Sequence, residues 1–138
     1  MTDYPDLNLL IDGVWRKSSN GDSLPVINPA TEERLTDLPS ASAADLDQTL
    51  ASSERGFKLW RAMSPYVRGK ILIKCANLVR ERAQEIAVAV TLENGKPLAE
   101  ALMEVGTVGD IIEYSAEQGK RMHGRIVEGR APDTTHYV

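Results

Sequence analysis

The sequence predicts an α+β chain with two amino-terminal β-hairpins, four helices and a final strand pair. Three observations lead to this prediction. Apolar and polar residues alternate between turn signals over the first forty residues. From Pro39 to Gly119 apolar residues recur every three or four positions, as on one face of a helix. Beyond Gly124 the chain returns to β-branched and aromatic residues, which favour strands.

Both hairpins are predicted from turn residues that separate short apolar runs. Asp12-Gly13 lies between Leu9–Ile11 and Val14-Trp15, and these residue types readily adopt the positive φ angles of a tight turn. Asn20-Gly21-Asp22 is a second turn signal, followed by an apolar run that ends at Asn28-Pro29, because proline removes a ladder donor. We expect Thr31–Leu38 to return as the partner of that strand.

The first two helices are predicted to begin at recognisable caps. Ser42 and Asp45 approximate a capping box, and Ser64-Pro65 combines a capping hydroxyl with a proline suited to the first turn. Helical spacing places one set of apolar residues on a single face of each helix, and we expect both faces to be buried. These residues are Leu46, Leu50, Phe57 and Trp60 in the first helix, and Ile71, Cys75, Leu78 and Val79 in the second.

The next two helices are separated by Asn94-Gly95, a pair that readily takes the left-handed conformation after a helix. The third has its apolar face at Ile86, Ala87, Val90 and Leu92. The fourth has a continuous apolar seam and is expected to end near Gly119. Its members are Leu98, Leu102, Val105, Gly109, Ile112 and Ala116.

Composition narrows the range of functions. The 138 residues are 42% hydrophobic, sufficient for a modest single core, and the net charge of -4 comes from 20 acidic and 16 basic residues without a basic stripe. We therefore expect neither a nucleic-acid nor a membrane partner. One cysteine excludes an internal disulfide framework, and the polar start is unlike a signal peptide, so the cytoplasm is the expected location.

Several motifs, taken in order, resemble those of the aldehyde dehydrogenase superfamily. The most specific are Val26–Glu33, with the sequence VINPATEE, and Thr91–Glu100, with the sequence TLENGKPLAE. Ile11–Trp15, Phe57–Trp60 and Arg68–Leu72 also resemble family segments, in the family's order and approximate spacing. The similarity extends from about Leu9 to Val138. Within the superfamily, the chain resembles the succinate-semialdehyde-dehydrogenase-like branch.

The resemblance implies an amino-terminal portion of a larger α/β protein with a Rossmann-type fold. Residues 1–124 would supply hairpins and helices of the dinucleotide-binding domain, and residues 125–138 the start of an oligomerisation arm. The full protein would oxidise an aldehyde to a carboxylic acid with NAD or NADP and form a dimer or tetramer. In this family a cysteine thiolate attacks the aldehyde, hydride passes to the nicotinamide, and glutamate-activated water releases the acid.

The resemblance places the catalytic and cofactor-binding residues of the family downstream of this chain. We therefore expect no catalytic and no cofactor-binding residue here, and no activity from the chain alone. Two alternatives remain open: a self-standing helical adaptor that binds a partner without catalysis, and an interrupted reading frame or a fragment of a longer subunit.

Three residue patterns could suggest chemistry, but each has a simpler interpretation. Cys75 lies on the predicted buried face, so we expect a structural cysteine and not a nucleophile. Gly95-Lys96 lacks the other residues of a phosphate-binding loop, which favours a helix-to-helix turn. His123 and His136 lack the spacing of a zinc site and are expected to be solvated.

The resemblance also suggests two sites. Many family members hold a monovalent cation between backbone carbonyls before Asn-Pro and an acidic side chain before Asn-Gly-Lys, which correspond here to Val26, Ile27 and Glu93. Such oxygen ligands suit hard cations. The family more often has aspartate at the acidic position, and a solvated carboxylate is an equally compatible interpretation of Glu93.

The second suggested site lies on the fourth helix, which borders the substrate entrance in family members. Asp110, Ile111 and Tyr114 would then contact the aldehyde in the full protein. Glu113 and Glu117 on the same helix form an i, i+4 acidic pair. With Lys120 and Arg121 nearby, a solvated charged face explains this pair better than an acid/base couple.

Overall fold

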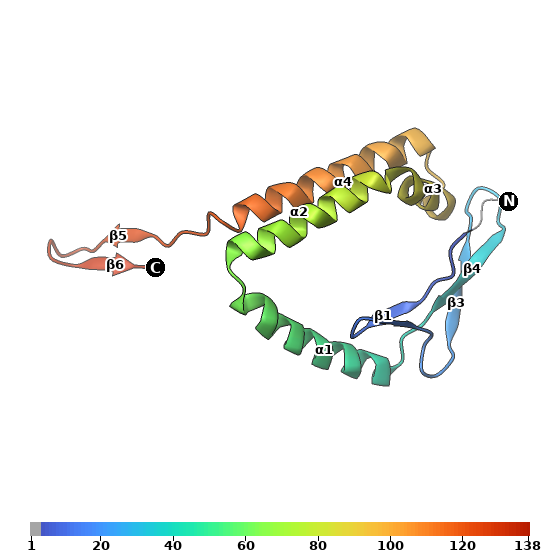
Figure 1. Cartoon of the computed structure of the whole chain (residues 1–138), viewed down its shortest axis with the longest axis horizontal. Helices are drawn as coiled ribbons and strands as arrows, with labels where there is room; N and C mark the ends of the chain where they lie inside the picture. Colours follow the sequence, from blue (N-terminus) through green and yellow to red (C-terminus); the bar gives the residue numbers. More distant parts are fainter. Residues whose placement is uncertain (1–3) are drawn as a thin grey trace.

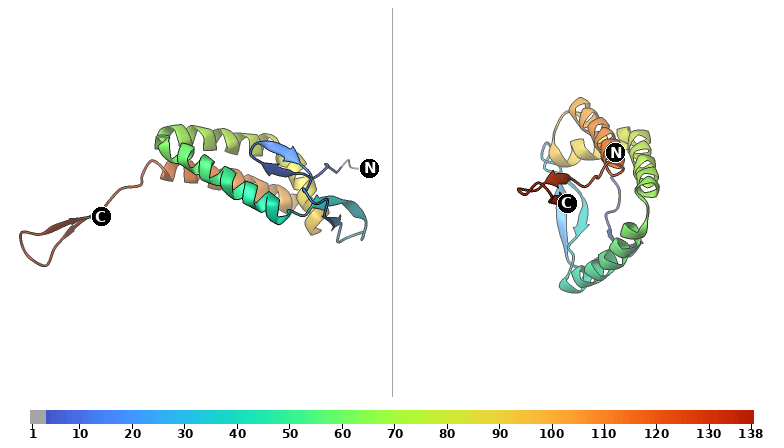
Figure 2. Two further views of the ribbon diagram at one scale, coloured as in Figure 1. Left: turned by 90° about the horizontal axis from the view of Figure 1, so that it is seen from below. Right: turned by 90° about the vertical axis from the view of Figure 1, so that its left-hand side faces the viewer.

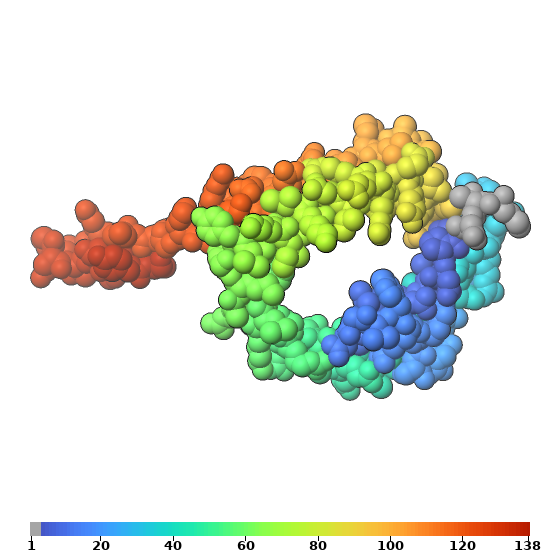
Figure 3. Space-filling view, viewed as in Figure 1, coloured from blue at the N-terminus to red at the C-terminus, as the bar shows by residue number. Residues whose placement is uncertain are grey.

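The computed structural model describes residues 4–138, which form an open ring with one projecting arm (Figure 1). The two amino-terminal hairpins and the first helix lie along one side of the ring, and the other three helices lie along the opposite side. The space-filling view shows an opening between these two sides (Figure 3). The arm contains the last two strands and points away from the ring (Figure 2).

The first hairpin forms as predicted. Strands β1 (Leu9–Ile11) and β2 (Val14–Arg16) are antiparallel, with Leu9 opposite Arg16. Asp12 and Gly13 have φ angles of 53° and 78°, the left-handed pair that a two-residue hairpin turn requires.

The second hairpin joins β3 (Ser23–Ile27) to β4 (Arg34–Pro39), which confirms the predicted return strand with a slightly later start. Gly21 takes a positive φ of 79° in the turn before β3. The pairing register shifts between Val26 and Ile27, so the ladder is irregular immediately before Asn28-Pro29.

Helix α1 (Ala43–Ala62) begins at the predicted capping box, but its predicted buried face is exposed. Leu50 and Phe57 are 68% and 60% exposed, and Asp45 is the buried residue of the helix. The prediction was wrong because the elements of this chain that contact α1 lie on its polar side, as described below.

Helix α2 (Pro65–Glu81) begins at Ser64, whose hydroxyl accepts a hydrogen bond from the Val67 amide. The predicted buried stripe is largely wrong: Ile71, Cys75 and Leu78 are exposed. The buried residues are Gly69 and Ala76, because small residues allow α2 to pack closely against the last long helix.

Helices α3 (Ala83–Asn94) and α4 (Leu98–Gln118) confirm their predicted end signals and the predicted face of α3. The α4 seam is confirmed from Leu102 onward, whereas Leu98 is exposed and the buried Ala101 was not predicted. Gly95 ends α3 in the left-handed conformation, with φ of 80°. Between α3 and α4 lies the main apolar core, and α2 contributes at its margin. Its buried members are Ala87, Ala101 and Val105, surrounded by Val79, Ala83, Ile86, Val90 and Leu102.

Strands β5 (Ile126–Glu128) and β6 (Thr135–Tyr137) form the predicted strand pair. The pairing continues through Arg125 and Val138, whose backbone groups exchange two hydrogen bonds. Every residue of both strands is exposed. Among residues 4–138, no helix is sufficiently long and apolar to span a bilayer.

Candidate functional site

 The two motifs of highest specificity, Val26–Glu33 and Thr91–Glu100, meet in space although they are far apart along the chain. Both belong to turns: Asn28-Pro29 follows β3, and Gly95 follows α3. A Cβ atom on Gly95 would lie 3.0 Å from Cγ of Pro29, so the proline ring packs directly over the glycine. Because Gly95 also has a positive φ, both its conformation and its surroundings favour glycine.

Glu93 lies beside this contact and has a partner that the sequence did not predict. The Tyr4 hydroxyl donates a hydrogen bond to the Glu93 carboxylate and so ties the amino-terminal segment to the end of α3. Partial burial of the phenol, followed by this hydrogen bond, raises the pKa of Tyr4 to about 12. No local sequence pattern links Tyr4 to Glu93, because the two residues meet only through the tertiary fold.

The predicted cation ligands are therefore brought into one region, but not into a cluster of acidic side chains. Val26 and Ile27 lie two or three residues before Pro29, and Glu93 lies two residues before Gly95. In residues 4–138, no group of three His, Cys, Asp or Glu side chains could hold a metal ion. Any cation here would depend on backbone carbonyls.

The residues predicted at a substrate entrance lie on the exposed side of α4. Ile111 and Tyr114 are exposed, and Asp110 pairs with Arg80 of α2 at 2.8 Å. Arg80 also contacts Glu113 at 2.6 Å. Its side chain crosses α4 over Gly109, where an added Cβ would lie 3.1 Å from both Cγ and Nε of the arginine.

Each carboxylate of the acidic pair Glu113 and Glu117 on α4 contacts a cationic side chain. Glu113 contacts Arg80, and Glu117 contacts Lys120 at 2.7 Å. The Lys120 hydrogen bond lowers the pKa of Glu117, the direction expected for a carboxylate that stays ionised. These contacts agree with the predicted charged face.

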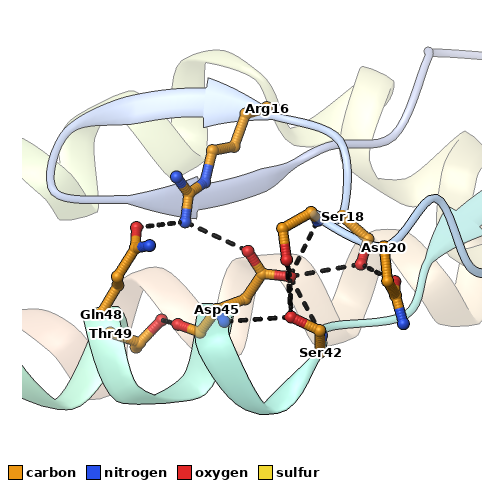
Figure 4. Close-up of polar contacts among 8 residues, drawn as sticks. Arg16, Ser18, Asn20, Ser42, Asp45, Gln48 and Thr49 are labelled. Atoms are coloured by element: carbon orange, nitrogen blue, oxygen red, sulfur yellow. Dashed lines mark hydrogen bonds and ion pairs between the residues drawn. The ribbon is translucent and has the colours of Figure 1, made fainter.

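The most extensively bonded polar group is Asp45, whose side chain is fully buried (Figure 4). Its Oδ2 accepts hydrogen bonds from the backbone amides of Ser19 and Ser42, both at 3.0 Å. The hydroxyl of Ser18 also donates to Oδ2, at 3.2 Å, and Arg16 donates to Oδ1, at 3.2 Å. We call these five residues the Asp45 cluster.

The Asp45 cluster joins the start of α1 to the segment that follows β2. The amides of Ser19 and Ser42 hold the pKa of Asp45 well below its usual range, more than offsetting the effect of desolvation. The sequence predicted Asp45 only as part of a helix cap. The long-range donors were missed because the short polar run Ser18–Asn20 carries no signal of a distant partner.

Comparison with known proteins identifies the family of this chain. The sequence profile of the aldehyde dehydrogenase family matches residues 15–138. The chain belongs to the aldehyde dehydrogenase family. This confirms the resemblance carried by the Asn28-Pro29 and Asn94-Gly95 motifs.

Individual aldehyde dehydrogenases are similar over nearly the whole chain. A 4-(hydroxymethyl)benzenesulfonate dehydrogenase of Comamonas testosteroni is 40% identical over 91% of this chain and 26% of its own length. The NADP-dependent succinate-semialdehyde dehydrogenase of Escherichia coli is 36% identical over 89% of this chain and 26% of its own. The crystal structure of succinate-semialdehyde dehydrogenase from Burkholderia pseudomallei is 29% identical, with a TM-score of 0.87, over 95% of this chain and 27% of that one.

The chain thus spans about a quarter of the length of the aldehyde dehydrogenases that it matches. Its four helices and small antiparallel strand pairs reproduce the corresponding part of their fold. Aldehyde dehydrogenases of this family use NAD or NADP.

Gly95-Lys96 makes the contacts of a turn between two helices. Nζ of Lys96 is 2.5 Å from a carboxylate oxygen of Glu104, and Gly95 packs under Pro29. This confirms the predicted helix-to-helix turn. Cys75, His123 and His136 are exposed, so the expected burial of the cysteine was wrong.

Proposed function

We propose that this chain is the amino-terminal part of an NAD(P)-dependent aldehyde dehydrogenase that oxidises an aldehyde to a carboxylic acid. The observation that carries the proposal is the family match over residues 15–138, which includes both motifs that meet at Pro29 and Gly95. We further propose a substrate of the succinate-semialdehyde class, on the basis of the similarity to two enzymes named for that substrate.

Within this proposal, the turn at Pro29 and Gly95 positions a monovalent cation site. The carbonyls of Val26 and Ile27 and the carboxylate of Glu93 would be the ligands, because hard cations prefer oxygen. The irregular ladder between Val26 and Ile27 supports this assignment, since such an interruption disturbs the regular pairing of backbone groups. Glu93 would have to share its carboxylate with Tyr4 or exchange that hydrogen bond for the cation.

The exposed side of α4 would border the path of the aldehyde in the complete protein. Asp110, Ile111 and Tyr114 offer a carboxylate, an aliphatic side chain and a phenol on neighbouring turns. The ion pair with Arg80 would fix the position of Asp110 at that border.

The organisation of the complete protein belongs to the same proposal. Residues 1–124 would be part of the dinucleotide-binding domain, and residues 125–138 would begin an oligomerisation arm in a cytoplasmic dimer or tetramer. The fully exposed β5–β6 hairpin supports an arm, because its unpaired edges can accept further strands. A self-standing helical adaptor is not favoured, because the family match covers most of the chain.

A chimera tests the proposed activity. Residues 1–138 would replace the corresponding first quarter of the E. coli succinate-semialdehyde dehydrogenase. We expect the purified chimera to reduce NADP with succinate semialdehyde, and the 138-residue chain alone to show no reduction above background. A folded chimera that binds NADP without oxidising any aldehyde would contradict the proposal.

A pair of glycine variants in the chimera tests whether the Pro29–Gly95 contact matters. Gly95→Ala should lower activity, because the new Cβ meets Pro29 at a positive φ. Gly106→Ala is the matched control, because an added Cβ at Gly106 has no atom within 4 Å. Equal activity of the two variants would show that the Pro29–Gly95 contact does not affect the activity of the chimera.

A further inference from the structure

We infer that Arg80 is a specificity-determining residue, which allows an anionic aldehyde to pass the exposed side of α4. It does so by neutralising part of the negative charge of Asp110 and Glu113, two carboxylates on that helix. The inference rests on the proposed function, in which this side of α4 borders the path of an aldehyde of the succinate-semialdehyde class. It adds a role in substrate selection to the ion pair that fixes Asp110.

The guanidinium group of Arg80 is held between the two carboxylates by contacts from both helices. Its Nη2 donates hydrogen bonds to Asp110 at 2.8 Å and to Glu113 at 2.6 Å. Its Nη1 lies 3.5 Å from Oδ1 of Asn77, one turn earlier on α2. Because Gly109 has no side chain, the arginine can cross α4 directly above it. The positive charge therefore has a defined place on this surface.

The carboxylates, and not the arginine, are the outermost charges of this group. The side chains of Asp110 and Glu113 are 77% and 50% exposed, whereas that of Arg80 is 37% exposed. A solute that approaches this part of α4 therefore meets the carboxylates first. One positive and two negative charges leave a net charge of -1, and without the arginine the net charge would be -2.

The neighbouring positions of α4 carry no unpaired charge that could replace Arg80. Ile111 and Tyr114 present an aliphatic side chain and a phenol, both more than half exposed. On the next turn, the carboxylate of Glu117 is 2.7 Å from Nζ of Lys120. The charge of this side of α4 is thus set mainly by whether Arg80 is present.

The chemistry of the proposed substrate makes this charge relevant. Succinate semialdehyde carries a carboxyl group at the end opposite to the aldehyde, and such groups ionise near about pH 4. The substrate is therefore an anion at neutral pH, and exposed like charges repel it over distances of up to about 10 Å at 0.1 M salt. A second uncompensated negative charge beside its path lowers the local concentration of the anion and raises KM. A neutral aldehyde has no net charge to be repelled.

Direct binding of the substrate carboxylate by Arg80 is a different role for the same residue. The contacts favour neutralisation, because Nη2 already donates to two carboxylates that the substrate would have to displace. The two roles also differ in a measurable way. If Arg80 neutralises Asp110 and Glu113, removing all three charges restores substrate affinity. If Arg80 binds the substrate, removing all three charges does not restore it.

The chimera that contains residues 1–138 allows a direct test. KM and kcat would be measured with succinate semialdehyde and with butanal, a neutral aldehyde of the same chain length. At low ionic strength, Arg80→Gln should raise KM for succinate semialdehyde by about three- to tenfold and leave kcat unchanged within about twofold. The increase should fall below about twofold at high salt. KM for butanal should change by less than about twofold at either salt concentration, because its approach does not depend on charge.

Two further variants make the test specific. Arg80→Gln combined with Asp110→Asn and Glu113→Gln removes the repelling charges together with the arginine. It should return KM for succinate semialdehyde to within about twofold of the value for the original chimera. Arg61→Gln removes an exposed arginine from α1 and should leave both KM values unchanged.

Three results would overturn the inference while the original chimera oxidises succinate semialdehyde, so that the proposed function stands. The first is an equal rise in KM for both aldehydes in Arg80→Gln, which would indicate a structural role. The second is no rise for succinate semialdehyde. The third is a rise that persists in the triple variant, which would indicate direct binding by Arg80. A chimera that oxidises neither aldehyde would instead contradict the proposed function, and the inference would fail with it.

Discussion

Helices α2, α3 and α4 are held together by apolar side chains, whereas α1 is held to the first hairpin mainly by polar ones. The three-helix region buries Ala76, Ala87, Ala101 and Val105, and these small residues allow close contact between helices. At α1 the buried side chain is Asp45, which is satisfied by hydrogen bonds from the segment after β2. An apolar core can form within this chain, while an apolar face without a partner needs polar contacts to hold its helix in place.

The largest expected effect comes from disturbing the apolar region. Ala101 is fully buried, so Ala101→Leu should force α3 and α4 apart and reduce the free energy of unfolding by about 2 to 3 kcal/mol. Urea denaturation followed by circular dichroism would measure this change. Ala99→Leu, on the exposed side of α4, should change it by less than about 0.5 kcal/mol. Similar losses for both variants would mean that the core is not closely packed.

The next effect concerns the polar region. Asp45→Asn removes the negative charge that accepts hydrogen bonds from Ser19 and Ser42 and pairs with Arg16. Amide hydrogen exchange should become faster in α1 and the first hairpin, with little change in α3 and α4. Asp47→Asn, at an exposed position of α1, is the matched control. Faster exchange throughout the chain would show that the two regions are not separable.

The contribution of Asp45 to the free energy of unfolding should decrease as the pH falls. Its pKa is lowered in the folded chain, so its stabilising effect is present above the unfolded value of about 3.9 and is lost as the pH falls below it. The difference between the original chain and Asp45→Asn should therefore be large near neutral pH and shrink in acid. A difference that grows in acid would contradict this sign.

The smallest expected effect is that of the exposed ion pairs between α2 and α4. Arg80→Gln removes the contacts with Asp110 and Glu113, both substantially exposed, and should cost less than about 1 kcal/mol at low salt and less still at high salt. Arg61→Gln on α1 controls for the loss of an exposed arginine. If the loss of stability in Arg80→Gln does not depend on salt, the packing of Arg80 over Gly109 contributes more to stability than the charge of Arg80.

Much of the fold was predictable from sequence because its signals are local. The Asp12-Gly13 turn, the Ser42 cap and the Gly95 helix end all depend on residues within a few positions of one another. Most of the α4 seam was also predicted correctly, because Val105, Gly109 and Ala116 follow one regular spacing, although the buried Ala101 was missed. The family resemblance was confirmed, while the cation and substrate-entrance assignments stay predictions.

The errors concern which side of a helix meets a neighbour. Cys75 was expected to be buried with Ile71, yet Gly69 and Ala76 form the buried side of α2. Helical spacing shows that residues share a face, but it does not show which face another element of this chain will contact. For α1 and α2, large apolar residues lie on sides that the elements present here do not cover.

The sequence by itself determined the order of the elements, their turns and caps, and membership of the aldehyde dehydrogenase family, because these depend on residue types at short or fixed spacing. Only the tertiary structure decided that Pro29 packs on Gly95, that Tyr4 binds Glu93 and that Asp45 joins α1 to the segment after β2. Each of these contacts joins positions far apart in the chain. Their formation depends on how whole elements pack, which no local pattern of residues specifies.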